Sequence, residues 1–78
     1  MNLAIITPSA ANTVANVQRV SIPGSLGNFV ILSGHAPLAS TMAKGVVQYR
    51  QGSEEKELAV SGGVVKVERD EVSIIIEQ

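Results

Sequence analysis

Short runs of β-branched and aliphatic residues, separated by turn residues every eight to twelve positions, constrain the fold more than any other feature of this sequence. The runs at 3–7, 46–50 and 71–77 are examples, and Pro8 and Gly52 stand at two of the breaks between such runs. Val and Ile favour strands, and no segment shows the sustained 3.6-residue period of an amphipathic helix. The pattern predicts an all-β domain, a two-sheet β-sandwich of about ten short strands.

Four segments carry more specific expectations. Between Asn12 and Ile22 the alternation changes parity near Asn16, which predicts either two strands or a bulge. Leu38–Ala43 fits one helical turn or a short strand. Glu54–Glu57 reads as a solvated strand edge, where charge discourages unwanted pairing. Ile74–Ile76 predicts a strand that is covered on both faces at its end.

The core must be aliphatic, because Phe29 and Tyr49 are the only aromatic residues. A chain of 78 residues forms one domain, 1–78, and its stability is expected to be modest, roughly 5 kcal/mol. Strand periodicity predicts eight mostly buried side chains: Ile5, Val20, Ile22, Ile31, Val47, Val60, Val65 and Ile74.

Composition argues against several classes of protein. The net charge is −1 and the sequence contains no cysteine, so a basic nucleic-acid stripe, a disulfide and a thiolate metal site are not expected. The start lacks the basic region of a signal peptide, and no apolar run has the length of a transmembrane helix. We therefore expect a soluble chain that neither binds nucleic acid nor inserts directly into lipid.

The stretch Pro23–Leu38 is the most distinctive part of the chain, with three of the seven glycines and the only His and Phe. Pro23-Gly24 and Leu26-Gly27 suit tight turns, and the apolar run 29–32 is long enough for a buried strand. Ser33-Gly34 then breaks the strand. Two turns around a short strand form a shaped surface that suits contact with another protein, and equally suits ordinary turns at a sandwich end.

Catalytic and cofactor sites find little support. His35 is the only imidazole and Asp70, on a distant hairpin turn, is the only Asp, whereas nucleophilic catalysis needs a nucleophile, a base and an orienting group together. A Ser33–His35 pair is conceivable, but Gly34 favours a turn between them. Phosphate-binding motifs and metal-ligand sets are absent from the sequence, so we expect a non-enzyme without a cofactor.

Lys66 supports one alternative from a different class. Lipoyl and biotinyl carrier domains are small all-β domains that present a modified Lys at a hairpin tip, and Val65-Lys66-Val67 offers a faint match. Lys66 lies inside an alternating strand, however, with Arg69-Asp70 as the turn. A solvent-facing strand lysine is the simpler interpretation.

The distinctive stretch also carries a family resemblance. PGSLGNFVILSGHAPLAS is similar to the segment PGSEGEFGILPGHAPLLT typical of the epsilon subunit of bacterial and chloroplast F-type ATP synthases. Residues 34–38 match in full, as does Ser61-Gly62-Gly63, and Gly45-Val46-Val47 and Ala59-Val60 fall at the family's spacing. The resemblance covers essentially the whole chain, but only the family's N-terminal β-sandwich domain.

The resemblance implies two five-stranded sheets packed face to face in a non-catalytic subunit of the rotor's central stalk. Such a subunit binds the gamma subunit and rests on the membrane c-ring, at the cytoplasmic face of the bacterial inner membrane or an equivalent energy-coupling membrane, and it transmits rotation in ATP synthesis driven by a proton gradient. By motif position, the implied c-ring contacts are Leu26, Gly27, Asn28 and His35. The implied gamma contacts are Thr7, Pro37, Leu38 and Ser40.

Three departures from the family pattern change these expectations. Leu26 and Asn28 stand where Glu is frequent, so a neutral contact replaces an acidic one, and Ser33 stands where Pro is usual. The C-terminal helical hairpin, the family's regulatory arm, has no counterpart in this sequence. Because 72–78 reads as a complete strand, we expect a naturally short subunit that neither inhibits ATP hydrolysis nor binds ATP.

Overall fold

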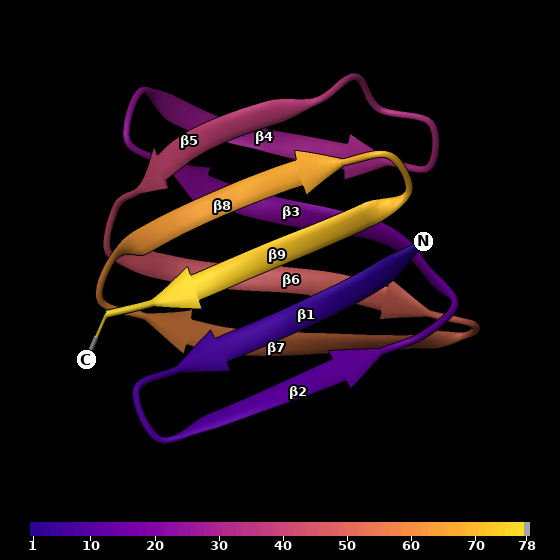
Figure 1. Cartoon of the computed structure of the whole chain (residues 1–78), viewed down its shortest axis with the longest axis horizontal. Helices are drawn as coiled ribbons and strands as arrows, with labels where there is room; N and C mark the ends of the chain where they lie inside the picture. Colours follow the sequence, from indigo (N-terminus) through magenta and orange to yellow (C-terminus); the bar gives the residue numbers. More distant parts are fainter. Residues whose placement is uncertain (78) are drawn as a thin grey trace.

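Nine β-strands make up the regular structure of residues 1–77, the part of the chain that the computed structural model describes (Figure 1). Most strands coincide with β-branched or aliphatic runs, although the strand at 54–60 begins with four charged residues. Gly, Pro, Asn or Ser residues lie at most of the turns between strands. The strands are β1 (Asn2–Thr7), β2 (Ala10–Val14), β3 (Val17–Gly24), β4 (Gly27–Leu32), β5 (Leu38–Met42), β6 (Gly45–Gln51), β7 (Glu54–Val60), β8 (Gly63–Glu68) and β9 (Glu71–Ile76).

The strands form two facing layers, as the all-β sandwich prediction requires (Figure 1). One layer has the order β2-β1-β9-β8-β5 and the other the order β4-β3-β6-β7. A single residue pair between β3 and β5, Gly24 with Met42, joins the layers into one curled sheet. The layers thus hold five and four strands, one fewer than the two sheets of five implied by the resemblance.

Neighbouring strands are antiparallel except for β1 and β9, which run parallel. In that pair Leu3 lies opposite Val72, and Ile5 lies opposite Ile74. This pairing brings the two ends of the described chain into adjacent strands. A parallel pair cannot be closed by a tight hairpin, so here the intervening strands act as the connection.

The space between the layers is filled by aliphatic side chains and Tyr49. Seven of the eight predicted core residues are buried, and the eighth, Ile5, is half-buried and packs against the core. No polar or charged residue is buried in the described part of the chain. The buried set is Leu3, Val17, Val20, Ile22, Ile31, Met42, Val47, Tyr49, Val60, Val65, Val67, Val72, Ile74 and Ile76.

Two expectations about apolar runs were wrong. Ile75 is 48% exposed between two buried neighbours, because only one face of β9 meets the opposite layer. The run 29–32 is not a buried strand either: β4 pairs only with β3 and lies at the edge of its layer, so its full burial is confined to Ile31. In both strands, successive side chains point to opposite faces, and this alternation decided which residues are buried. The hydrophobicity of the run as a whole did not.

The open alternatives are resolved as strands. Asn16, in the left-handed region at φ 57°, separates β2 from β3, and the β3–β6 register also shifts between Val17 and Arg19. Both a break and a bulge therefore account for the change of parity. The segment that fitted a helical turn or a strand is β5, which pairs with β8 over its whole length. Glu54–Glu57 lies on β7, at the outer edge of its layer, as expected.

Candidate interaction surfaces

The β3–β4 hairpin presents the first group of predicted contact residues at one end of the sandwich. Gly24 pairs with Gly27, which leaves Ser25 and Leu26 as a two-residue loop. Gly27 has φ +132°, a conformation that strongly favours glycine. The Leu26 side chain is completely exposed, and Asn28 is exposed on the first residues of β4. The hairpin therefore exposes the Leu26 side chain and the Asn28 side-chain amide to solvent.

His35 lies in the loop between β4 and β5, half-buried. Its backbone N–H donates to the Leu32 carbonyl at 3.1 Å, and its ring Nδ1 lies 2.7 Å from the Ala36 carbonyl oxygen. The ring has no hydrogen bond to a carboxylate or hydroxyl in residues 1–77. This geometry fits a loop residue and gives no base–nucleophile pair of the kind catalysis requires.

The structure separates His35 from the other predicted c-ring residues. Leu26, Gly27 and Asn28 lie where β4 begins, and His35 follows its other end (Figure 1). A six-residue strand spans about 17 Å. These four residues therefore meet one partner surface only if that surface extends along the length of β4.

The predicted gamma contacts are likewise spread over one layer. Thr7 ends β1, where its Oγ1 accepts from the Ala10 N–H at 3.1 Å and donates to the Ala10 carbonyl. Pro37 is exposed just before β5, while Leu38 and Ser40 are half-buried on its inner side. Leu38 packs against the core. Two strands, β9 and β8, lie between β1 and β5.

Lys66 does not occupy the position of a carrier lysine. It lies within β8, paired with Ser73 of β9 and Ala39 of β5. Its exposed ammonium group forms an ion pair with Glu68 at 3.4 Å. The hairpin tip consists of Arg69 and Asp70, so the simpler interpretation of Lys66 fits the fold.

Asp70 was expected on a hairpin turn distant from the Ser33–His35 segment, and this expectation was wrong, because its side chain contacts Ser33. Its carboxylate accepts from the Ser33 hydroxyl at 3.0 Å and lies 3.5 Å from the Met1 amino group. Its carbonyl accepts from the Asn2 N–H. Ser33 follows β4 in one layer and Asp70 joins β8 to β9 in the other, so this contact ties the layers together at the end where His35 lies.

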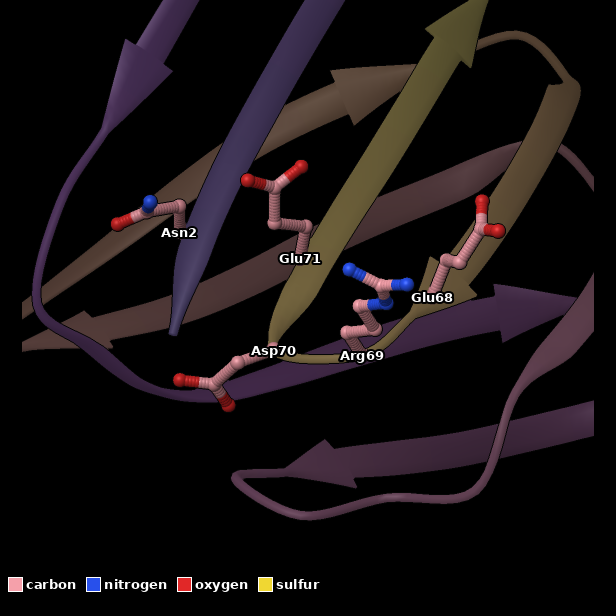
Figure 2. A pocket seen from close by; sticks show the side chains of 5 residues that line it. All are labelled: Asn2, Glu68, Arg69, Asp70 and Glu71. Atoms are coloured by element: carbon pink, nitrogen blue, oxygen red, sulfur yellow. The ribbon is translucent and has the colours of Figure 1, made fainter.

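A shallow hollow lies beside this tie, lined by Asn2 and residues 68–71 (Figure 2). Figure 2 shows the Asp70 side chain pointing away from those of the other four residues. In residues 1–77 no group of three or more His, Asp or Glu side chains is arranged to hold a metal ion. The hollow is an open surface feature, and nothing in its lining points to a ligand.

Charge is distributed very unevenly along the chain. Arg19 is the only charged side chain before Lys44. Arg19 forms an ion pair with Glu55 of β7, which also lies 3.9 Å from Arg50, and Gln48 donates to Glu57 at 3.0 Å. The outer face over β3, β6 and β7 is thus polar, whereas β4, its following loop and β5 carry no charged side chain at all.

Leu26, Val30 and Leu32 make the β4 region the main site of exposed large apolar side chains. Val30 is 47% and Leu32 55% exposed. Sequence reasoning missed Val30 and Leu32 because an apolar run was taken as a sign of burial. The absence of charged residues from segment 20–43 was the sequence feature that could have indicated an exposed, uncharged surface. Within residues 1–77 no helix is long and apolar enough to span a membrane.

Comparison with known proteins gives a consistent family match. The sequence profile described as "ATP synthase, Delta/Epsilon chain, beta-sandwich domain" matches residues 1–78. ATP synthase epsilon chain 1 of Syntrophotalea carbinolica is 40% identical over 77 residues, which are 99% of this chain and 56% of that protein. The epsilon chain of Magnetococcus marinus is 38% identical over 78 residues, 57% of its length. The chain thus spans little more than half the length of these relatives.

Solved structures with a similar fold come from ATP synthases. A chain in the central stalk/c-ring of the Tetrahymena thermophila mitochondrial enzyme superposes with a TM-score of 0.86 at 19% identity, covering 100% of this chain and 63% of that one. A chain in the OSCP/F1/c-ring assembly of Euglena gracilis gives 0.86 at 20% identity, covering 97% and 49%. At these identities the likeness establishes the fold alone.

Proposed function

Because this chain belongs to the family of ATP synthase delta/epsilon chain β-sandwich domains, we propose that it is a non-catalytic subunit of the central stalk of an F-type ATP synthase. In this role it couples rotation of the membrane c-ring to the gamma subunit during ATP synthesis driven by a proton gradient. The observation that carries the proposal is the family match over the complete chain. The subunit would be a peripheral part of the complex, at the cytoplasmic face of a bacterial membrane.

The fold suits a mechanical role. Coupling requires a body that keeps its shape under load and offers two separate contact surfaces. Interiors packed with aliphatic side chains have low compressibility, and the described chain has only short connections between its strands. The exposed hairpin at Leu26 lies beside Met42 at the end of β5, whereas Pro37 directly precedes the start of that strand, so the sandwich offers separate surfaces for the ring and for gamma.

We assign the c-ring contact to Leu26, Gly27 and Asn28. Leu26 is uncharged and fully exposed, which suits an apolar contact, and Asn28 adds an amide that can donate and accept hydrogen bonds. His35 is kept as a second, separate ring contact that needs a partner surface long enough to follow β4.

We assign the contact with the gamma subunit to Thr7, Pro37, Leu38 and Ser40. Thr7 and Pro37 are accessible at their strand ends, whereas Leu38 already packs against the core. Any contribution of Leu38 to gamma binding therefore acts mainly through the position of β5.

Co-purification tests the proposal directly. The chain, expressed with the gamma subunit of the same genome, is expected to elute with gamma as a stoichiometric complex, and the purified complex is expected to bind isolated c-rings in detergent. An unrelated β-sandwich protein of similar size, expressed with gamma in place of this chain, serves as the control. Failure of the wild-type chain to retain either partner contradicts the proposal.

A further inference from the structure

Exposed side chains form a row along the outer face of β4. Successive strand residues point to opposite faces, and the burial pattern of β4 places Asn28, Val30 and Leu32 on the outer face while Ile31 points into the core. Neighbouring members of this row are two residues apart, or about 6–7 Å. Leu26 precedes the row in the exposed hairpin loop. We call Leu26, Asn28, Val30 and Leu32 the β4 strip.

The β4 strip carries no charge of its own and is bordered by polar residues of β3. Ser21 lies opposite Val30, and Arg19 lies opposite Leu32. The Arg19 guanidinium is paired with Glu55 of β7, which lies on the side of β3 away from β4, so this cation is drawn away from the strip. An exposed apolar patch with a polar rim is typical of a surface that another protein covers.

The strip lies between the two parts of the ring contact assigned above. Leu26 and Asn28 lie where β4 begins, and His35 follows its other end (Figure 1). A partner surface that reaches both ends follows β4 along its length. Val30 and Leu32 are the exposed side chains between the two ends, so such a surface meets them as well.

We propose that Val30 and Leu32 contact the c-ring and join the two assigned parts into one continuous, uncharged contact. The inference rests on the proposed function, which supplies the ring as the neighbour of Leu26, Asn28 and His35. No Asp, Glu, Lys or Arg occurs from 20 to 43, so burial of apolar surface, and not ion pairing, drives this contact. The ring surface over the strip must be uncharged as well, because a charge desolvated there would have no partner.

Binding of isolated c-rings in detergent to the complex of this chain with gamma tests the contact. Val30→Lys is expected to weaken ring binding by about tenfold or more, because its ammonium group would be desolvated without a partner. Val64→Lys is the matched control, since Val64 is a 41% exposed strand residue in the other layer. Its affinity is expected to stay within about twofold of wild type, as for most surface substitutions away from a contact.

Salt shows whether the lysine acts in the contact or at a distance. At about 0.5 M NaCl, charges that are not in contact are screened, so the loss caused by Val30→Lys is expected to persist. Recovery of wild-type affinity at this salt concentration would mean that the lysine lies outside the contact, and would overturn the inference. Val30→Thr keeps the shape and strand preference of valine and is expected to weaken ring binding by about threefold through the added hydroxyl. It therefore tests the contact even where the lysine disturbs β4.

The outcomes separate the inference from the proposed function. A wild-type complex that does not bind c-rings contradicts the proposed function. Wild-type affinity of Val30→Lys and Val30→Thr for the rings overturns the inference and leaves the proposed function standing. Dissociation of gamma from the Val30→Lys chain on gel filtration, with ring binding unchanged, assigns the strip to gamma. Loss of a wild-type homodimer assigns it to a second copy, and either result overturns the ring contact.

Discussion

At the scale of single residues, glycines at strand ends decide how closely segments can approach. A Cβ atom on Gly63 would lie 2.0 Å from the carbonyl oxygen of Ile75, and the residue has φ +139°. Gly27 has a similar φ, +132°, but a Cβ there would meet nothing within 4 Å. Gly63 is thus required for both conformation and space, and Gly27 for conformation only.

This contrast predicts different costs for the same substitution. Gly63→Ala is expected to destabilise the fold by about 3–5 kcal/mol, the sum of backbone strain and overpacking against β9. Gly27→Ala is expected to cost about 1–3 kcal/mol, from strain alone. Urea denaturation of both variants measures the difference. Equal free energies of unfolding would show that β9 can move away from Gly63.

Exposed residues of the hairpin should affect assembly and leave folding intact. Asn28 is exposed beside Leu26, so Asn28→Arg is expected to change the unfolding free energy by less than about 0.5 kcal/mol. In reconstituted enzyme the added cation lies poorly paired at the proposed ring contact, and ATP-driven proton pumping is expected to fall while hydrolysis continues. His35→Ala, at the other end of β4, gives the separate test of that contact.

At the scale of elements, the two layers are joined differently at the two ends of β4. At the hairpin end, the Gly24–Met42 pair and two flanking backbone hydrogen bonds, Ser25 to Thr41 and Ala43 to Pro23, join β3 to β5. At the other end, the side-chain contact between Ser33 and Asp70 joins the β4–β5 loop to the β8–β9 turn. The first junction consists of backbone groups, whereas the second depends on two side chains.

A double-mutant cycle measures the side-chain tie. Ser33→Ala and Asp70→Ala are each expected to destabilise the chain by about 0.5–1 kcal/mol, because the hydrogen bond is exposed to water. Asp70→Ala also removes the contact with the Met1 amino group, so it should be the larger of the two. The coupling energy is expected to be a few tenths of a kcal/mol, with faster exchange of the His35 amide in both variants. Strict additivity and unchanged exchange would mean that the tie does not order the loop.

At the scale of the whole molecule, stability rests on one thin aliphatic core. Fourteen hydrophobic residues within 1–77 are buried, and a domain of this size has about 4–12 kcal/mol of total stability. A single core truncation therefore removes a large share of the total, whereas surface apolar side chains contribute little.

Ile74 and Ile75 of β9 allow a core position and a surface position to be compared with the same side chain. Ile74 is 0% and Ile75 48% exposed. Ile74→Ala is expected to cost about 2–5 kcal/mol through lost burial and a cavity, and Ile75→Ala less than about 1 kcal/mol. Thermal and urea denaturation of both variants provide the measurement. Similar losses would mean that the outer face of β9 is covered in solution.

Local features of the sequence were sufficient for the strands, their inner faces and the aliphatic core, because alternation and turn chemistry act over a few residues. The motif at 34–38 similarly indicated the family. Hairpin partners such as β8 and β9 could be predicted from the turn between them, but partners distant in the sequence could not, since β1 pairs with β9 from the other end of the chain. Such pairing depends on how all strands fill the two layers together.

The tertiary structure also decided which apolar residues meet water and which contact residues lie together. Val30 and Leu32 are exposed because β4 ends a layer, and Ile75 because β9 has a covered face on only one side. Leu26 and His35 are nine positions apart in the sequence. They lie at opposite ends of β4 because this extended strand separates them. Asp70 meets Ser33 for the opposite reason: two turns from different layers close the same end of the sandwich.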